Sequence, residues 1–355
     1  MFKMVHRRKS RKVKVGKIYI GGDAPITIQS MTTTDTTDVD ATVKQIQDLE
    51  EVGCEIIRVS APTMEAAHAL KEIKANINIP LVVDIHFDYR IALEAAKYVD
   101  KLRINPGNIG KEEKVKLVVK AAKDYGIPIR VGVNLGSLEK QLFEKYGYSA
   151  EGMVESALNH LKILEDLDFY DTIVSLKASD VTRMVAAYRL FAGKTDYPIH
   201  LGVTEAGSKI PGAVKSSMGM GILLSEGIGD TIRVSLSEDP REEVRVGKQI
   251  LRSLGLRKEG VEVTACPTCA RTHVDVIKMV EQIEAKTEKI KKPIHIAIMG
   301  CAVNGPGESK KVDLGIVGGP ANTNLLYKDG KIIAKVEKDK IVETVLREID
   351  IINKQ

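Results

Sequence analysis

The 355-residue chain is 43% hydrophobic and 28% charged, with a formal net charge of +5, values that are ordinary for a globular protein of two domains. It has 4% aromatic residues and no Trp, so it lacks the stacking side chains that nucleic-acid binding would need beside its basic residues, and we expect no nucleic-acid partner. Its apolar runs are too short for a membrane span, and no apolar segment follows the basic N-terminus as in a secretory signal, so we expect a cytoplasmic protein without membrane contact.

The first residues of the chain are basic, and we expect them to form a solvated arm. After them, residues 12–19 and 26–30 alternate in the manner of strands around a turn at Gly21, Gly22 and Asp23, which predicts a hairpin. The basic residues of the arm are Arg7, Arg8, Lys9, Arg11, Lys12 and Lys14.

Eight short strand-like runs then alternate with stretches of helical periodicity. The helical stretches end in typical signals, since residues 40–52 stop at Gly53 and residues 111–125 stop at Gly126. Alternating β and α units need right-handed parallel crossovers, and eight units favour a closed (β/α)8 TIM barrel over an open sheet. The predicted strands are residues 26–31, 55–60, 81–87, 101–105, 127–133, 171–177, 199–204 and 231–236.

Five of these strands carry a cation. Side chains two apart in a strand share a face, so we expect the five to converge inside the barrel near the carboxyl ends of the strands, where barrel enzymes have their active sites. Arg and Lys are almost never buried without partners. Salt bridges to Asp84 and Glu205 alone are one explanation, but the excess of cations favours a bound polyanion such as a phosphate ester. The cations are Arg58, Arg103, Arg130, Lys177 and Arg233.

Other phosphate-binding signals are missing from this part of the chain. Neither a Walker A loop nor a dinucleotide fingerprint follows a strand, so ATP and dinucleotides lose support. His86 is the best placed histidine because it shares a strand end with Asp84. Cys54, directly before a strand, suggests a buried thiol.

We expect the barrel domain to span residues 1–238 and a second domain to span residues 239–355. Asp239 and Pro240 open an amphipathic helix that Gly255 stops, so the linker is short. The remainder predicts a small α+β domain. Its expected elements are strands at 261–264, 294–298 and 314–317, a helix at 271–285, a hairpin around Asp329 and Gly330, and a closing helix at 338–349.

Three of the four cysteines, Cys266, Cys269 and Cys301, lie in this second domain. Two thiolates separated by two residues can bind one ion or cluster, and a third can close on the same point. A Gly-Pro-Gly turn after Cys301 could aim the Glu308 carboxylate at the fourth position. A structural zinc with His273 or water as fourth ligand, or a buried thiol cluster, remain alternatives. Reduced thiols that hold a metal fit four cysteines better than a disulfide framework does.

With both sites in view, the chain resembles the family of 4-hydroxy-3-methylbut-2-en-1-yl diphosphate synthases, the iron–sulfur enzymes of the methylerythritol phosphate route to isoprenoids. The resemblance covers nearly the whole length. Its most specific pieces are Ile26-Thr27-Ile28-Gln29-Ser30-Met31-Thr32, Arg103-Ile104-Asn105-Pro106-Gly107-Asn108, Cys266-Pro267-Thr268-Cys269 and Asn304-Gly305-Pro306-Gly307-Glu308.

The resemblance implies a substrate-binding barrel and a cluster-binding second domain. The implied substrate is 2-C-methyl-D-erythritol 2,4-cyclodiphosphate, which is reductively opened and dehydrated to 4-hydroxy-3-methylbut-2-enyl diphosphate. The implied ligands of a [4Fe-4S] cluster are Cys266, Cys269, Cys301 and Glu308. The diphosphate would be bound by Arg58, Arg103, Arg130, Lys177, Arg233 and Ser235, with Asn134 nearby and with Asp84, Asn105 and Glu205 lining the same pocket.

Partners follow from the same resemblance. The interval between residues 237 and 261 has no room for an extra domain, as in the two-domain form of the family, which implies a homodimer in which one subunit's cluster domain completes the other's barrel site. Two electrons are needed and one cluster carries one, so reduced ferredoxin or flavodoxin must dock. We expect Glu205 or a neighbouring acid to supply the proton.

Two other functions fit the same residues. One is a non-redox phosphate-ester lyase or transferase barrel with a structural zinc domain. The other is an electron-transfer module whose cationic barrel only docks an acidic partner.

Overall fold

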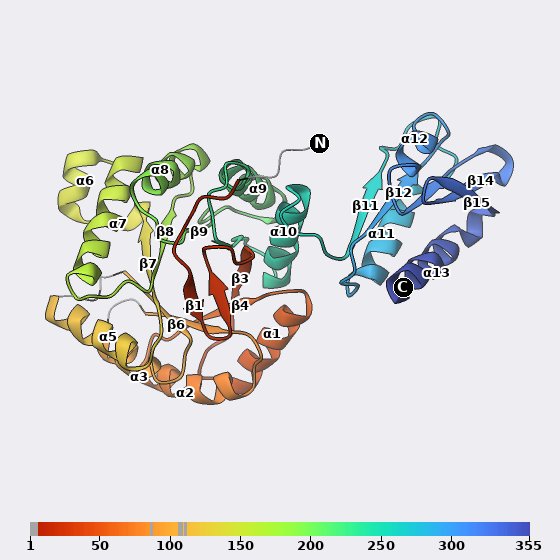
Figure 1. The fold of residues 1–355 in the computed structure, drawn as a ribbon. Coiled ribbons are helices and arrows are strands. Elements are labelled where there is room, and N and C mark those ends of the chain that lie inside the picture. Colours follow the sequence, from red (N-terminus) through yellow and green to blue (C-terminus); the bar gives the residue numbers. More distant parts are fainter. Residues whose placement is uncertain (1–5, 86–87, 106–108, 110–111) are drawn as a thin grey trace. The chain divides into compact units, whose positions relative to one another are not determined.

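The computed structural model describes residues 6–85, 88–105, 109 and 112–355 (Figure 1). The chain forms two compact units, Met1–Leu256 and Arg257–Gln355. The division lies later than the predicted boundary after residue 238, because helix α10 (Pro240–Ser253) packs on strand β3 and on helices α1 and α9 of the barrel. Helix α10 is therefore a part of the barrel and not a linker.

The predicted barrel is confirmed. The described residues form an eight-stranded sheet in the order β8-β7-β6-β5-β4-β3-β10-β9, in which every neighbouring pair is parallel. A single parallel bridge between Val174 on β8 and Ile199, directly before β9, links the two ends of the sheet, so the barrel is nearly closed. The strands are β3 (Thr27–Met31), β4 (Ile56–Ser60), β5 (Leu81–Asp84), β6 (Lys101–Ile104), β7 (Ile129–Asn134), β8 (Thr172–Lys177), β9 (His200–Leu201) and β10 (Thr231–Ile232).

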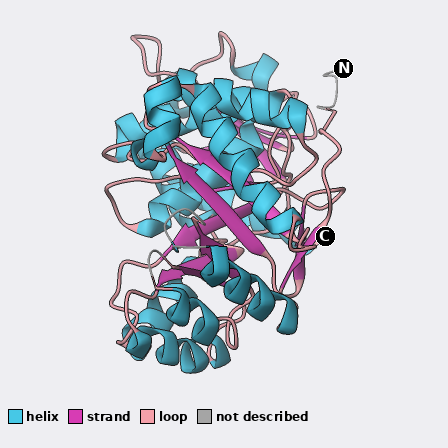
Figure 2. Ribbon diagram, turned by 90° about the vertical axis from the view of Figure 1, so that its left-hand side faces the viewer, coloured by secondary structure: helices cyan, strands magenta, loops and turns pink. Residues whose placement is uncertain are grey.

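Helices surround these strands (Figures 1 and 2). Several begin at a side chain that accepts a hydrogen bond from the first turn, such as Asp38, Thr63 and Asp180, which satisfies backbone N–H groups that lack a partner in the helix. The helices are α1 (Val39–Glu51), α2 (Met64–Ala75), α3 (Tyr89–Ala95), α5 (Glu112–Asp124), α6 (Lys140–Tyr146), α7 (Ala150–Glu165), α8 (Val181–Lys194), α9 (Lys209–Ser225) and α10, and a 3-10 turn η1 covers Leu135–Ser137.

The strands present two kinds of face. Apolar residues such as Ile57, Leu102 and Val131 pack with the helices in one large core. The residues between them, which include the predicted cations, point to the other face, as the period of two requires. The core of the barrel domain therefore lies between strands and helices, and the polar side chains are left for the barrel interior.

The predicted N-terminal hairpin is wrong in its pairing. Strand β1 (Val13–Val15) pairs antiparallel with β2 (Ile18–Ile20), and Gly16, with φ 55°, makes the turn. Residues 26–30 instead lie mostly in β3, a barrel strand. The chain turns back already at Gly16, inside the stretch predicted as one strand, and the apolar side chains of the hairpin face inward and close the amino-terminal end of the barrel, where they form a small core. That core contains Val13, Val15, Ile20, Ile56, Val82 and Ile173.

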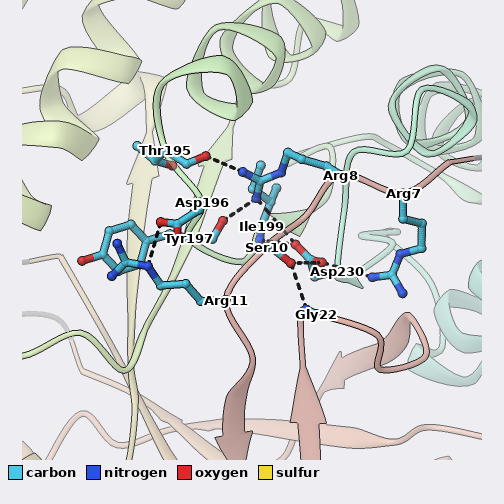
Figure 3. A network of polar contacts seen from close by, with 10 residues as sticks. All are labelled: Arg7, Arg8, Ser10, Arg11, Gly22, Thr195, Asp196, Tyr197, Ile199 and Asp230. Carbon is cyan, nitrogen blue, oxygen red and sulfur yellow. Dashed lines mark hydrogen bonds and ion pairs between the residues drawn. The ribbon is translucent and has the colours of Figure 1, made fainter.

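The predicted solvated arm is also wrong. Arg7 and Arg8 converge on Asp230, whose side chain is 4% exposed, with Nη2 of Arg7 3.1 Å from Oδ1 (Figure 3). Ser10 donates to the same oxygen at 2.8 Å, and Arg11 Nε donates to Asp196 at 2.7 Å. A buried carboxylate needs such partners, and the arm supplies them at strands β9 and β10, which have only two residues each. The arm thus stabilises the barrel at β9 and β10, where the fewest residue pairs join the strands.

The second unit has a five-stranded sheet in the order β11-β12-β13-β14-β15, as far as the chain is described. The first three strands are parallel and the last two pair antiparallel. Helices α11 and α13 contribute to its core. The helix predicted from residue 271 begins later, because Asp275 caps it. The elements are β11 (Val261–Ala265), α11 (Val276–Thr287), β12 (Ile294–Met299), α12 (Gly305–Ser309), β13 (Leu314–Val317), η2 (Pro320–Asn322), β14 (Asn324–Lys328), β15 (Lys331–Val336), η3 (Lys338–Lys340) and α13 (Ile341–Lys354).

A membrane span is not found in the structure. Among the residues described, every helix is too short or too polar to cross a bilayer.

Candidate active site

The predicted cations lie on strands β4, β6, β7 and β8 and directly after β10, on the face of the strands that points into the barrel. Four of them are buried, and the fifth, Arg233 after β10, is half-buried. Strand register places Arg103 on β6 beside Arg130 on β7. The buried four are Arg58, Arg103, Arg130 and Lys177.

Asp84 at the end of β5 is the carboxylate within this group. Arg103 Nη1 donates to its Oδ1 at 2.8 Å, and Arg58 Nη1 lies 3.5 Å from its Oδ2. Arg58 also directs Nε and Nη2 at the sulfur of Met31, at 3.1 and 2.7 Å. One buried carboxylate therefore orients two guanidinium groups, and a weak sulfur acceptor meets the other side of Arg58.

A second carboxylate, Glu243 on α10, was not predicted. It is buried and accepts from Ser30 Oγ at 3.1 Å and from the backbone N–H of Leu236 at 3.0 Å. Its Oε2 lies 3.6 Å from Nε of Arg233. The neighbouring Glu242 faces outward to Lys209. Sequence alone offered only a weak signal, an acid on the apolar side of an amphipathic helix.

Arg130 is the most deeply buried of the five, with 1% of its surface exposed. Its Nη1 donates to Ser175 Oγ at 2.6 Å, while Nε and Nη2 have no hydrogen-bond partner among the described residues. Guanidinium donors buried in this way are costly unless an acceptor meets them.

Burial also perturbs the protonation of this group. Desolvation, followed by the nearby Arg233, lowers the pKa of Arg58 to about 9. Desolvation and neighbouring arginines hold the pKa values of Arg130 and Lys177 well below their ordinary values. The four buried cations and the half-buried Arg233 lie with two buried carboxylates, Asp84 and Glu243, so basic side chains outnumber acidic ones in this interior. The arrangement is suited to a multivalent anion.

The remaining predicted residues lie around the same ends of the strands. Asn105 follows β6, Asn134 ends β7 opposite Lys177, and Ser235 follows β10. Glu205 lies exposed in the loop after β9 with φ 52°, a left-handed conformation that is uncommon outside glycine. Such a conformation often marks a functional loop. His86 and the Pro106-Gly107-Asn108 part of the predicted motif fall outside the described residues.

The cysteines of the second unit lie on one edge of its sheet. Cys266 follows β11 and Cys301 follows its parallel neighbour β12. The backbone N–H of Gly300 donates to Cys266 Sγ at 3.0 Å, so the sulfur of Cys266 lies at the turn that carries Cys301. A Cβ at Gly300 would come 2.8 Å from Thr272, so only glycine allows this close approach.

Cys269 is joined to the same turn through the backbone. Its carbonyl accepts from the N–H of Thr272 at 3.0 Å, and the N–H of His273 donates to the carbonyl of Gly300 at 2.9 Å. A backbone hydrogen bond from Arg271 lowers the pKa of the exposed Cys269 thiol. By contrast, Cys54 is buried as predicted, and burial raises its pKa to about 12. The thiolate form is therefore favoured at Cys269, in the predicted metal site, and disfavoured at Cys54, in the barrel.

The segment that carries Glu308 differs from the predicted turn. The expected Gly-Pro-Gly turn is the short helix α12, which Pro306 favours because the first turn of a helix needs no N–H there. The carboxylate of Glu308 pairs with Lys311 Nζ at 2.9 Å. Among the described residues, no three His, Cys, Asp or Glu side chains stand together as metal ligands. The donor set nevertheless fits a soft metal centre, because three reduced cysteines lie on linked turns and a backbone N–H already points at one sulfur.

Two family models match nearly the whole chain. The GcpE TIM-barrel domain matches residues 10–248, and the GcpE protein C-terminal domain matches residues 262–351. The 4-hydroxy-3-methylbut-2-en-1-yl diphosphate synthase (flavodoxin) of Geobacillus thermodenitrificans is 56% identical over 99% of this chain and 94% of its own length. The protein of the same name from Bacillus subtilis is 56% identical over 98% of this chain and 93% of its own length.

A solved structure resembles the fold. Dihydropteroate synthase from Stenotrophomonas maltophilia aligns with 69% of this chain and 98% of its own, with a TM-score of 0.51 and 14% identity. At this identity the likeness concerns the fold alone.

Proposed function

The chain belongs to the GcpE family of 4-hydroxy-3-methylbut-2-en-1-yl diphosphate synthases, and on this premise we propose that it converts 2-C-methyl-D-erythritol 2,4-cyclodiphosphate to 4-hydroxy-3-methylbut-2-enyl diphosphate. The reaction opens the cyclic diphosphate, releases one hydroxyl as water and consumes two electrons. The observation that carries the proposal is the excess of buried cations in the barrel, because a diphosphate would supply the missing negative charge.

We assign the diphosphate to the inner face of the strands. Guanidinium groups pair with phosphate oxygens through a planar fork, and donors already oriented by Asp84 and Glu243 need little rearrangement when charge develops on the leaving phosphate. Fixing both ends of the ring also orients the bond that breaks. The proposed binding residues are Arg58, Asp84, Arg103, Asn105, Arg130, Asn134, Lys177, Arg233 and Ser235.

The second unit would hold the redox centre. The proposed ligands are Cys266, Cys269, Cys301 and Glu308, and a [4Fe-4S] cluster, when bound there, supplies electrons one at a time. Glu308 would first leave Lys311. As the one oxygen ligand among thiolates, it is the ligand that we expect to exchange most readily.

Glu205 is our candidate for the acid that delivers a proton to the departing hydroxyl. Its loop lies at the carboxyl end of β9, the side of a barrel where catalytic groups collect. Its carboxylate is exposed, so it can recover a proton from solvent between turnovers.

The partners that we propose follow from the electron count. The names of the relatives specify flavodoxin, so reduced flavodoxin is the donor that we favour over ferredoxin. We also propose a homodimer in which the cluster unit of one subunit completes the barrel site of its partner. The cytoplasm remains the proposed compartment, because four free cysteines persist in reducing conditions.

Anaerobic purification tests this proposal. We expect a brown protein with about four iron and four sulfide per chain and turnover with reduced flavodoxin. Cys269→Ala should lose iron and turnover, whereas Cys54→Ala, which changes a buried thiol in the barrel core, should keep both. Glu308→Cys should keep the iron and lose turnover. A colourless zinc protein without turnover would refute the proposal and support the non-redox alternative.

A further inference from the structure

Three further polar side chains, those of Gln29, Lys101 and His200, are buried inside the barrel beside the cations assigned to the diphosphate. Lys101 and His200 are completely buried, each with 0% exposure. Lys101 Nζ, both ring nitrogens of His200 and both amide atoms of Gln29 have no hydrogen-bond partner among the described residues. Buried polar atoms nearly always have partners, so these unsatisfied atoms call for a functional explanation.

Lys101 lies at the deep end of the cation group. It opens β6 and shares a face with Arg103, two residues further along the strand. Its register partner on β5 is Val82, which belongs to the apolar core that hairpin β1–β2 forms at the amino-terminal end of the barrel. The amine therefore lies between an apolar floor and the cations above it.

The charged groups that act on Lys101 are cations. They are Arg130 on β7 and Arg58 on β4, and desolvation acts with them to hold the pKa of Lys101 well below its ordinary value. His200 on β9 faces Arg130, Lys177, Lys101 and Arg58, and its pKa is lowered in the same way. A neutral amine and a neutral imidazole are the forms that this environment favours.

We infer that Lys101 accepts a proton at the deep end of the diphosphate site. Its neutral amine takes up one proton from solvent when a diphosphate binds among the cations nearer the barrel mouth. The inference rests on the proposed function, since it needs a diphosphate in the barrel. The bound anion opposes the positive field of Arg130 and Arg58, and charges inside a protein interact strongly enough to reverse the preference of the amine. One amine and one proton give one ammonium ion, and no other bond changes.

The proposed reaction explains why a proton acceptor at Lys101 would be useful. The cyclic diphosphate has one ionisable oxygen on each phosphorus, whereas the linear product has an additional one on its terminal phosphate. The ammonium that forms on Lys101 when the diphosphate binds is already in place at ring opening, and it offsets part of the negative charge that the product adds to the buried site.

Calorimetry of pyrophosphate binding to the cluster-loaded protein tests the inference. Titrations in two buffers of different ionisation enthalpy give the number of protons taken up, and the difference between variants cancels the titration of pyrophosphate itself. We expect the wild type to take up about one proton more than Lys101→Met. Lys71→Met, which changes an exposed lysine on α2, is the matched control and should behave as the wild type.

The pH dependence has a defined sign. Because binding takes up a proton, the affinity of the wild type relative to Lys101→Met should fall as pH rises, by up to about tenfold per pH unit between the free-state and bound-state pKa values of Lys101. Below that window the ammonium is already present, and above it the amine stays neutral.

Two outcomes would overturn the inference. Equal proton numbers for the wild type and Lys101→Met would refute it and leave the proposed function intact, whereas wild-type protein that does not bind pyrophosphate at all would refute both. Carbon-13-labelled lysine gives an independent reading that needs no folded variant in the titration. Two lysine signals, those of Lys101 and Lys177, should titrate far below the others in the free protein and move to the ammonium position with pyrophosphate, and fewer than two moving signals would also refute the inference.

Discussion

The barrel contains two groups of basic side chains that differ in how they are satisfied. At the amino-terminal end, the terminal guanidinium nitrogens of Arg7 and Arg8 and the Nε of Arg11 meet carboxylates and backbone carbonyls, whereas the Nε atoms of Arg7 and Arg8 have no partner among the described residues (Figure 3). In the interior, Arg130 has two nitrogens without partners among the described residues, and Lys101 has none for its amine. The first group stabilises the fold. The second costs stability, which is expected of a site that awaits an anion.

Arg130→Met should give the largest effect. Removal of a buried donor to phosphate should lower kcat/KM by about a hundredfold to a thousandfold. The thermal stability should stay the same or rise, since a buried charge is replaced by an apolar side chain of similar length. Turnover and the unfolding temperature measure the two effects. A variant that unfolds much more easily would show that Arg130 belongs to the stabilising group.

Asp230→Ala tests the other group. The loss of this buried carboxylate removes the acceptor of Arg7 Nη2, of Ser10 Oγ and of the backbone N–H of Ile199. We expect the free energy of unfolding to fall by about 3 kcal/mol, as for the breaking of a buried pair. The matched control is Asp196→Ala, because Asp196 is 56% exposed and should contribute under about 1 kcal/mol. Urea denaturation measures both, and equal losses would contradict the comparison.

High pH should affect the interior group and not the arm, without any change of sequence. Desolvation lowers the pKa of Arg58 to about 9. At Arg11, desolvation is the largest single cause, but Tyr197 and Asp196 together outweigh it and raise the pKa above its ordinary value. As pH rises through about 9, the charged form of Arg58 becomes less favoured in the free protein, so binding takes up a proton and the affinity for pyrophosphate should weaken by up to about tenfold per pH unit.

The sign for stability is opposite. Because the folded pKa of Arg58 is depressed, the unfolded chain binds more protons above pH 9, and its burial penalty is relieved as pH rises. Calorimetry of pyrophosphate binding at neutral pH and near pH 10 checks the affinity. A constant affinity would show that Arg58 does not act on the bound anion.

The sequence predicts local patterns in these two groups but not contacts between residues that are far apart along the chain. The interior cations follow a period of two along each strand, so their common face was predictable from local pattern alone. The partners of the arm were not, because Arg7 and Asp230 are separated by 223 residues and neither position signals the other. Glu243 was missed for the same reason, since its role depends on α10 packing against β3. The burial of Lys101 was not predicted, because a lysine at the start of a strand is usually exposed.

The smallest predicted effect concerns Arg11, at the exposed edge of the arm. Its guanidinium carbon lies 4.0 Å from the ring centre of Tyr197, and its Nε donates to Asp196 at 2.7 Å. We expect Arg11→Ala to lower the free energy of unfolding by about 1 kcal/mol, and Arg11→Lys to recover the ion pair but not the flat stacking on the ring. A double-mutant cycle with Tyr197→Leu should give a coupling of about 0.5 kcal/mol by urea denaturation. A coupling near zero would show that the ring of Tyr197 does not contribute to the stabilisation by Arg11. The arm would then be stabilised almost entirely through its buried contacts with Asp230.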